Sequence, residues 1–241
     1  MKKNVLVIGS NGGIGSAVIN ELSKDDEIAH IFSVSRNEKK HQDPRFSHYM
    51  VQDEESEITE FAQIMAEQKI CFHQVYCCLG VLHKDDGIKL TPEKRLEDIS
   101  QEQFLEYFRI NTVLPALWLK HLVNLVCKDK AVISIISARV GSISDNRLGG
   151  WYGYRSAKAA LNMVIKTAWV EYQRRRSNTI LISYHPGTVD TELSAPFQGN
   201  VKPEKLFTPE FTAERLVDIC KQAKIENSPY YIDWDAKSIN W

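Results

Sequence analysis

The 241-residue sequence contains no apolar run that approaches the roughly 18 residues a helix needs to cross a membrane. It also lacks an excess of one charge: 30 lysines and arginines stand against 31 aspartates and glutamates, a formal net charge of −1. Proteins that bind nucleic acid or acidic membranes through charge usually carry a marked basic excess. We therefore expect a cytoplasmic protein that binds neither nucleic acid nor membranes.

Cysteine and histidine are too few and too scattered to suggest a disulfide scaffold or a metal centre. The five cysteines are odd in number and include no Cys-x-x-Cys motif, so we predict no disulfide framework. The seven histidines show no metal-ligand spacing such as His-x-x-x-His, so we predict no metal. Cys77 and Cys78 are adjacent in an apolar segment, and we interpret them as small buried hydrophobic residues, with a redox or metal role as the alternative.

The amino-terminal segment has the pattern of a strand that runs into a phosphate-binding turn. Residues 5–8 are a short apolar run, as in parallel strands buried on both faces, and the glycine-rich segment 9–15 follows directly. In such a turn Gly9 permits the tight bend, Gly13 lets the backbone approach a pyrophosphate, and Gly15 allows close helix–strand packing. The following helix offers its free amides and positive dipole end to the phosphates. The segment predicts a dinucleotide site, with an ordinary glycine loop as the alternative.

Tyr154 and Lys158 stand four residues apart in a segment with helical periodicity. Residues at i and i+4 of a helix lie one above the other on the same face. An ammonium beside a phenol favours the phenolate, so Lys158 is expected to lower the pKa of Tyr154 from roughly 10 toward neutrality. Such a tyrosine can give a proton to a carbonyl oxygen or take one from an alcohol. A chance pair on a solvated helix face is the alternative, but the dinucleotide turn favours the chemical interpretation.

Apolar runs and amphipathic runs alternate along the chain, as in α/β proteins with a parallel sheet. The predicted strands are 4–8, 30–35, 46–51, 74–79, 131–137, 179–184 and 230–233, and the predicted helices are 13–24, 57–68, 101–127, 153–176 and 212–223. We therefore predict a single α/β domain over residues 1–241: a Rossmann-type, doubly wound parallel sheet of about seven strands flanked by helices. Irregular segments near 83–97 and 194–209 are expected to be substrate-side loops, the second a lid; surface insertions are the alternative.

Together these motifs resemble the short-chain dehydrogenase/reductase family, and the resemblance covers essentially the whole chain. Gly80 stands where the family usually has the glycine of Asn-Asn-Ala-Gly, and Asn111 stands at the family's active-site asparagine. Segment 186–191 matches the family's Pro-Gly-x-Val-x-Thr after the sixth strand. Segments 141–154 and 92–98 look closer still to the C-factor-like and sniffer-like carbonyl reductase branch.

The resemblance implies an arrangement of catalytic and cofactor-binding residues. Tyr154 would exchange a proton with the substrate oxygen, Lys158 would hold the nicotinamide ribose, and Asn111 would fix a water of the proton relay. The cofactor contacts implied are Gly9, Ser10, Asn11, Gly13, Ile14, Gly15, Ser35, Arg36, Asp53, Gly80, Tyr154, Lys158, Pro186, Gly187, Val189 and Thr191. Family members commonly pair through their two long helices, so we expect a homodimer or homotetramer, with a monomer as the alternative.

The end of the second predicted strand indicates which dinucleotide is bound. An acidic side chain there binds a ribose 2′-hydroxyl, whereas a 2′-phosphate is matched by an arginine. Segment 32–37 contains no carboxylate and has Arg36 available, with Ser35 and Asn37 as further hydrogen-bonding groups. We therefore predict NADP(H) over NAD(H). Asp53 resembles the family aspartate that binds the adenine amino group, with a plain surface acid as the alternative.

One catalytic position departs from the family pattern. The family's fifth strand usually ends Ser-Ser-x-x-Gly, with the second serine polarising the substrate carbonyl, and strict register places Ala138 at that serine. Ser137 is one residue early, and neighbours on a regular strand point to opposite faces, but a strand end can twist. Ser142 lies in a following loop that could fold back. We assign the role to Ser137, with Ser142 as the alternative, and expect weak activity if neither hydroxyl reaches the substrate.

Three functions are compatible with these features. The leading hypothesis is an NADPH-dependent carbonyl reductase for a small or medium apolar ketone or aldehyde, with Tyr154 as general acid. The second is an NADP(H)-binding signalling or regulatory protein with little turnover, which the C-factor resemblance and Ala138 favour. The third is a dehydrogenase of the alcohol or hydroxysteroid type, working in the oxidative direction. The intact catalytic tyrosine, lysine and asparagine favour the two enzymes over the binding protein.

Overall fold

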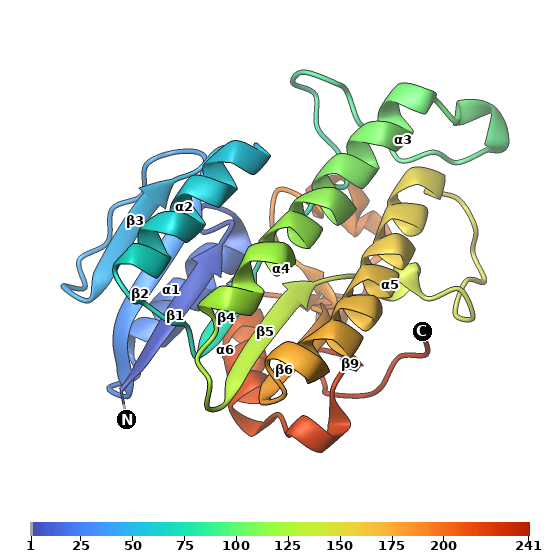
Figure 1. Ribbon diagram of the computed structural model, residues 1–241. Coiled ribbons are helices and arrows are strands. Elements are labelled where there is room, and N and C mark those ends of the chain that lie inside the picture. The colour runs from blue at the N-terminus through green and yellow to red at the C-terminus, as the bar shows by residue number, and fades with distance from the viewer. Residues whose placement is uncertain (1) are drawn as a thin grey trace.

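Seven parallel strands form the central sheet of the protein, whose computed structural model describes residues 2–241 (Figure 1). The strands are β1 (Lys3–Ile8), β2 (Ile28–Ser35), β3 (Phe46–Met50), β4 (Gln74–Cys77), β5 (Ala131–Ile136), β6 (Thr179–His185) and β9 (Tyr230–Asp233). Their order is β3-β2-β1-β4-β5-β6-β9, so the chain begins in the middle of the sheet and winds outward in both directions. The predicted doubly wound fold is confirmed, with each predicted strand close to its expected bounds.

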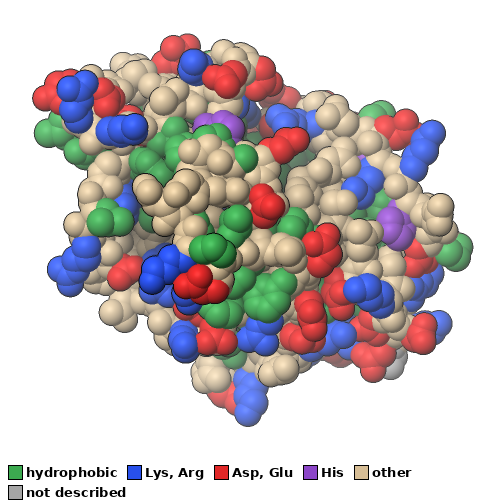
Figure 2. Space-filling view, turned by 180° about the vertical axis from the view of Figure 1, so that it is seen from behind, with side chains coloured by type: hydrophobic (Ala, Val, Ile, Leu, Met, Phe, Trp, Pro, Cys, Tyr) green, Lys and Arg blue, Asp and Glu red, His purple; other side chains and the backbone are tan. Residues whose placement is uncertain are grey.

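Helices cover both faces of this sheet. One face carries α2 (Glu55–Glu67), α4 (Leu114–Leu125) and α5 (Tyr152–Arg175), and the other carries α1 (Gly13–Ser23) and α6 (Pro209–Gln222) (Figure 1). The view from behind shows acidic and basic side chains interspersed over the surface (Figure 2). In β1, Leu6 and Ile8 belong to one core layer, whereas Val5 and Val7 belong to the other. Burial on both faces therefore explains why this strand is a continuous apolar run.

The long helix predicted over 101–127 is interrupted by a wider turn. α3 (Gln101–Phe108) continues into a π-helical turn, Arg109–Val113, and then into α4. Pro115 in the first turn of α4 has no N–H to donate to the carbonyl of Asn111, four residues earlier. Single π-helical turns are frequent at functional sites. Asn111 stands in the middle of this one.

The two segments predicted as substrate-side loops contain regular structure. In the first, Lys84 and Leu90 form an isolated antiparallel bridge. The second contains two short 3-10 helices, Ala195–Asn200 and Pro203–Lys205, and the strand β8 (Leu206–Phe207), which pairs with β7 (Thr188–Val189). The sequence did not predict β7 and β8, because two-residue strands are too short to show a periodic pattern.

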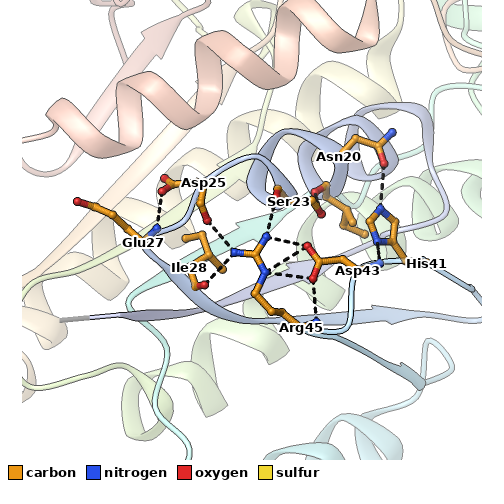
Figure 3. Close-up of polar contacts among 9 residues, drawn as sticks. Asn20, Ser23, Asp25, Glu27, Ile28, His41, Asp43 and Arg45 are labelled. Atoms are coloured by element: carbon orange, nitrogen blue, oxygen red, sulfur yellow. Dashed lines mark hydrogen bonds and ion pairs between the residues drawn. The ribbon is translucent and has the colours of Figure 1, made fainter.

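Arg45 ties the start of β3 to the connection between α1 and β2 (Figure 3). Its guanidinium donates to the backbone carbonyls of Ser23 at 2.6 Å, Asp25 at 2.9 Å and Ile28 at 3.1 Å. It also donates to both carboxylate oxygens of Asp43. The hydrogen bonds from Arg45 hold the pKa of Asp43 down, at about 2. Carbonyls at the end of α1, which lack intrahelical partners, are satisfied in this way.

The prediction of no disulfide is wrong for one pair of cysteines. Cys71 and Cys127, 56 positions apart in sequence, are joined by a disulfide with Cα atoms 4.9 Å apart. Cys71 precedes β4 and Cys127 follows α4, and a bridge between Phe72 and Val126 holds these two segments together. Only the packing of α4 against β4 creates this contact, so cysteine spacing could not reveal it. The other cysteines are free thiols: Cys77, Cys78 and Cys220.

Residues 2–241 contain neither a membrane-spanning helix nor a cluster of metal-binding side chains. No helix in this range is long and apolar enough to cross a membrane. The same residues contain no group of three or more histidine, cysteine, aspartate or glutamate side chains placed to hold a metal ion.

Candidate active site

A cleft opens at the carboxyl ends of the central strands, beside the glycine turn. Its walls come from that turn, the ends of β2 and β3, the segment after β4, and the π-helical turn; they include Gly9, Asn11, Ser35, Arg36, Asp53, Gly80 and Ile110. Doubly wound folds bind their ligands outside the carboxyl ends of the strands, where the strand order reverses. Predicted cofactor residues from four separate segments therefore line one cleft.

The glycine turn is shaped for a close backbone approach. Gly9 has φ of +79°, a left-handed conformation that a side chain disfavours. A side chain on Gly15 would overlap the carbonyl of Gly9, and a Cβ on Gly13 would lie 2.6 Å from Cγ2 of Thr191. The turn and the segment after β6 therefore meet here, as predicted. The hydroxyl of Ser10 is buried and makes no hydrogen bond within residues 2–241, so it keeps an unused donor beside the turn.

Arg36 lies at the open side of the cleft, with 64% of its side chain exposed. Its Nη1 lies 3.3 Å from Oδ2 of Asp53, which leaves other guanidinium N–H groups available to a ligand. The Asn11 amide and the Ser35 hydroxyl both donate to the carbonyl of Asn37, at 3.1 and 2.8 Å. The loop after β2 is thereby fastened to the glycine turn, with Arg36 between them and Asp53.

Lys158 and Asn111 lie directly behind Gly80, a residue of the cleft wall, and Tyr154 lies beside Lys158. The Nζ of Lys158 lies 5.8 Å from the centre of the Tyr154 ring and donates to the carbonyl of Ile136 at 2.9 Å. A Cβ placed on Gly80 would lie 3.4 Å from both Lys158 Nζ and Asn111 Oδ1, so the backbone of Gly80 borders both groups. The structure thus brings the predicted catalytic tyrosine, lysine and asparagine together from α5 and the π-helical turn.

Asn111 fastens the π-helical turn to the end of β4. Its Oδ1 accepts the N–H of Val81 at 3.1 Å, and its Nδ2 donates to the carbonyl of Val81 at 3.0 Å. The same Nδ2 donates to the carbonyl of Tyr107 at 3.1 Å. Both amide hydrogens are therefore used in positioning the cleft wall, and the predicted role in holding a relay water stays a prediction.

The electrostatics of the catalytic pair differ from the expectation. Burial raises the pKa of Tyr154 above its ordinary value, and the neighbouring phenol of Tyr231 raises it further. Burial lowers the pKa of Lys158 to about 8. Lys158 was expected to lower the pKa of Tyr154, but the removal of both groups from water outweighs that effect here. Tyr154 is therefore a phenol at neutral pH, able to donate its proton.

The Ser137 hydroxyl, the first choice for the catalytic serine, makes its hydrogen bond to Asn162 and not to Tyr154, and the assignment stays a prediction. The Ser137 hydroxyl donates to Oδ1 of Asn162 at 2.7 Å, and so does the hydroxyl of Ser183. Ala138 instead packs in the cluster that contains Tyr154. Both residues follow β5, which ends at Ile136, and the serine hydroxyl and the alanine methyl group lie in different surroundings.

Ser142, the alternative, is also engaged elsewhere. Its hydroxyl lies 3.3 Å from the Ser144 hydroxyl and accepts the N–H of Asp145 at 3.4 Å. Within the described chain neither Ser137 nor Ser142 makes a hydrogen bond to Tyr154. Both candidate serines therefore make their hydrogen bonds away from Tyr154.

Aromatic side chains form an edge-on series that ends at Tyr154. Trp151 lies 6.3 Å from the Tyr154 ring, and Phe197 lies 5.2 Å from Trp151, both in edge-on arrangements. His83 contacts Phe197 at 5.7 Å, and its Nε2 lies 2.9 Å from the carbonyl of Glu192. The segments near 83–97 and 194–209 therefore meet beside Trp151, and their role as substrate-side loops stays a prediction.

The remaining predicted cofactor residues lie near the carboxyl end of β6 or under the turn. Pro186 and Gly187 follow β6. Gly187 has φ of +78°, and a Cβ at this position would lie 2.6 Å from the ring of Phe207, so a side chain is disfavoured on both counts. Val189 belongs to β7 and is buried. Ile14 packs its side chain onto the core beneath α1, so its backbone alone can face a ligand.

Comparison with known proteins identifies the family. The model of the short chain dehydrogenase family matches residues 3–201. The chain belongs to this family. It is therefore an oxidoreductase by family, and the predicted resemblance is confirmed.

Relatives of this short-chain dehydrogenase differ in named activity. It is 28% identical over 184 residues to 1-hydroxy-2-glutathionyl-2-methyl-3-butene dehydrogenase of Rhodococcus sp. strain AD45, covering 76% of this chain and 75% of the relative. It is 24% identical over 239 residues to a benzil reductase, (S)-benzoin forming, of Bacillus cereus, covering 88% and 91%. The C-signal protein of Myxococcus xanthus is 26% identical over 109 residues, covering 45% and 60%.

Solved structures share the fold of this short-chain dehydrogenase. The carbonyl reductase Sniffer of D. melanogaster superposes with a TM-score of 0.84 at 20% identity over all of both chains. The NADPH-bound carbonyl reductase from chicken fatty liver superposes with a TM-score of 0.83 at 19% identity, covering 100% of this chain and 99% of that one. The expected sniffer-like branch is thus represented among the structures of the same fold.

Glu93 positions the catalytic helix of this short-chain dehydrogenase and was not predicted. Its carboxylate, 1% exposed, accepts the N–H of Gly153 at 3.3 and 3.2 Å, at the start of α5. Its carbonyl accepts the N–H of Trp151, whose φ of +53° is unusual for a bulky residue. A carboxylate is favoured at a helix amino terminus. Glu93 lies in segment 92–98, a stretch that carried the branch resemblance but gave no sign of this contact.

Two further side chains near the site were also missed. Lys39 Nζ lies 3.1 Å from the hydroxyl of Ser16 in α1, which places a second cation close to the glycine turn. The Tyr231 hydroxyl donates to the carbonyl of Ala138 at 2.8 Å and so holds the end of β5 beside Tyr154. Both contacts join segments that are distant in sequence, and no local sequence motif predicts them.

Proposed function

We propose that this short-chain dehydrogenase is an NADPH-dependent reductase of small or medium apolar carbonyl compounds. The observation that supports the proposal is the meeting of Lys158 and Asn111 behind Gly80, with Tyr154 beside Lys158, next to the cleft that Arg36 borders. A proton donor, a cation and an adjoining cleft for a cofactor are the parts that carbonyl reduction requires.

The cofactor is NADP(H). The glycine turn offers a cradle that side chains would fill, Ser10 offers an unused buried hydroxyl, and Arg36 offers a guanidinium for the 2′-phosphate. Solved structures of the same fold are described as bound to NADP and to NADPH. When bound, the cofactor supplies the hydride that adds to the carbonyl carbon.

Residues of the chain supply the proton for the substrate oxygen and stabilise the negative charge that develops during the reaction. Tyr154, a phenol at neutral pH, donates its proton to the carbonyl oxygen as negative charge develops there. Burial lowers the pKa of Lys158 to about 8, which is still above neutral pH, so most molecules carry a protonated Lys158. Its ammonium stabilises the phenolate left on Tyr154 and binds ribose hydroxyls. One hydride and one proton together reduce the carbonyl to an alcohol.

The walls over Tyr154 favour a flat apolar substrate. Trp151, Phe197 and the ring of His83 meet edge-on above it, and Leu82 belongs to the same apolar cluster. Aromatic rings pack well against such edges. The names of the Bacillus relatives, benzil reductases, support aryl ketones and diketones as the first compounds to test.

The test is a panel of apolar aldehydes, ketones and α-diketones, with NADPH consumption followed optically and NADP⁺ reduction by the corresponding alcohols as the reverse assay. Tyr154→Phe should lower turnover at least about 100-fold while NADPH binding survives. Tyr152→Phe, two residues away on the same helix, is the matched control and should keep full activity. Lys158→Met should lower both turnover and NADPH affinity. If Tyr154→Phe keeps more than about a tenth of the activity, the acid role is wrong.

A second candidate function is an NADP(H)-binding regulatory protein with little turnover. The specific observation in its favour is that Ala138, not a serine, shares the apolar cluster of Tyr154, while Ser137 donates a hydrogen bond to Asn162. The partial match to C-signal points the same way. Tight NADPH binding with no reduction of any compound in the panel would place this function first.

A further inference from the structure

Cys71 and Cys127 form a sulfur pair at the end of the sheet opposite Tyr154. Cys71 precedes the amino end of β4, and Cys127 follows the carboxyl end of α4. Two backbone hydrogen bonds flank the pair: the N–H of Phe72 donates to the carbonyl of Leu125 at 2.8 Å, and the N–H of Cys127 donates to the carbonyl of Phe72 at 3.0 Å. These bonds do not depend on the disulfide, so the two sulfur atoms stay neighbours when it is reduced.

The two sulfur atoms differ in accessibility and in their surroundings. Cys71 is half-buried, whereas Cys127 is 5% exposed. The Nδ1 of His73 lies 3.4 Å from Cys127 Sγ and accepts the N–H of Asn4 at 3.2 Å. Burial lowers the pKa of His73, so the ring is neutral at pH 7 and can accept a proton from a thiol. A two-step disulfide exchange requires an accessible thiol, a second thiol beside it, and a base for the second thiol, and Cys71, Cys127 and His73 supply these three.

The other three cysteines are unsuited to this chemistry. Burial raises the pKa of Cys77 to about 11 and that of Cys220 to about 12, and it raises the pKa of Cys78 as well. Thiols rather than thiolates are present at these sites, and the thiolate is the nucleophile. Oxidation by a disulfide is therefore directed to one pair.

We propose that Cys71 and Cys127 are a reversible redox site that reacts with low-molecular-weight disulfides such as oxidised glutathione. The Cys71 thiolate attacks one glutathione sulfur; the sulfur–sulfur bond breaks, and one glutathione leaves and takes up a proton. Cys127 then gives its proton to His73 Nδ1, which gives up its hydrogen bond from the N–H of Asn4, and the Cys127 thiolate attacks the Cys71 sulfur. The second glutathione leaves with the proton from His73, and the hydrogen bond to Asn4 forms again. Two protein thiols are oxidised to one disulfide, and one glutathione disulfide is reduced to two thiols. Excess reduced glutathione reverses both steps.

The disulfide closes a structural ring around β4 and the helix beside it. At the catalytic end, Asn111 bonds to both backbone groups of Val81, beyond β4. At the far end, Cys71 and Cys127 join the same two chain segments covalently. A cross-link over this separation removes conformations from the unfolded chain, so oxidation should raise the melting temperature by about 5–10 °C. In a reducing compartment such bonds are usually transient and responsive to redox conditions.

The test uses the full chain, reduced, freed of reductant, incubated with oxidised glutathione, alkylated in acid and mapped by peptide mass spectrometry. The wild type should form the Cys71–Cys127 disulfide and retain no glutathione. Cys127→Ser should stop with one glutathione on Cys71, and Cys71→Ser should take up none. His73→Asn keeps an acceptor for the N–H of Asn4 but provides no base, so the mixed disulfide should persist at least about tenfold longer. Cys78→Ser is the matched control and should behave as the wild type.

Two results would overturn the proposal. One is a wild type that keeps all five thiols free under oxidised glutathione. The other is a wild-type melting temperature that does not change when reductant is added. The Cys71→Ser, Cys127→Ser double variant is the control, and its melting temperature should not respond to reductant. Equal rates of ring closure in the wild type and in His73→Asn would remove the base from the mechanism. None of these readouts measures carbonyl reduction, so the redox site and the proposed enzymatic activity fail or survive separately.

Discussion

Ala138→Ser should increase carbonyl reduction, because it places a hydroxyl where the structure leaves only a methyl group. Ala138 has extended backbone angles, φ −153° and ψ 145°, and packs in the cluster that contains Tyr154. The preceding residue, Ser137, points to Asn162 instead. A serine at position 138 would carry its oxygen one bond beyond the present Cβ, toward the substrate carbonyl beside Tyr154.

The size of the gain follows from what one well-placed donor contributes. A hydrogen-bond donor aimed at developing oxyanion charge is worth about 10²–10³ in kcat where it is fully pre-organised. Ala138 has no supporting contacts evolved for a hydroxyl, so we expect about 10- to 100-fold in kcat/KM. A buried hydroxyl without a partner costs roughly 1–3 kcal/mol. The melting temperature should therefore fall by a few degrees.

The paired control is Ser137→Ala. It removes one hydrogen bond to Asn162, worth about 1 kcal/mol, while Ser183 still donates to the same oxygen. Melting should fall by about 2–4 °C and activity should stay within roughly threefold of the wild type. Steady-state NADPH oxidation with one responsive substrate measures both variants. If Ser137→Ala abolishes turnover in a folded protein and Ala138→Ser changes nothing, then the side chain at position 137, not the one at position 138, lies beside the substrate.

Three other expectations can be checked with the purified chain. Arg36→Asp should weaken NADPH binding at least tenfold, because it removes a charge-assisted contact worth about 1.5–3 kcal/mol. NADH binding should be unchanged or improved, and a wild type that prefers NADH in titration would contradict this. Met163, 66% exposed, lines a groove between α4 and α5, so we predict that two copies of the chain pair through this face. Met163→Glu should therefore give a monomer by light scattering, whereas Leu96→Glu, at an unrelated exposed site, should not change the mass. A wild type of monomer mass at micromolar concentration would refute the pairing. Because Arg45 holds the pKa of Asp43 at about 2, their pair stabilises the fold above about pH 4 and loses this contribution as the pH falls toward 2. Arg45→Met should cost about 2 kcal/mol in denaturant unfolding at pH 7 and show less acid sensitivity between pH 4 and 2, and equal acid sensitivity in both proteins would argue against the pair.

Local sequence determined the strands, the dinucleotide turn and the catalytic spacing. A strand under helices on both faces must be apolar at every position, and the run before Gly9 shows this without any knowledge of its neighbours. Gly15 has to lack a side chain because its own turn leaves no room, a constraint that acts within a few residues. Tyr154 and Lys158 face the same way because helix geometry alone brings i and i+4 together. Each of these features depends on contacts within one segment.

Tertiary structure alone decided the features that join distant segments. The buried carboxylate of Glu93 reaches the start of α5, sixty positions away in sequence, because the loop that carries it folds across the helix end. Cys71 and Cys127 meet because α4 ends where β4 begins, although neither cysteine has a local motif. The pKa of Tyr154 rises rather than falls because burial, a property of the whole packed site, outweighs the single charge that sequence spacing places beside it. Helices and strands have regular periods that can be recognised in the order of the residues. Desolvation and long-range contacts depend instead on which segments the fold packs together.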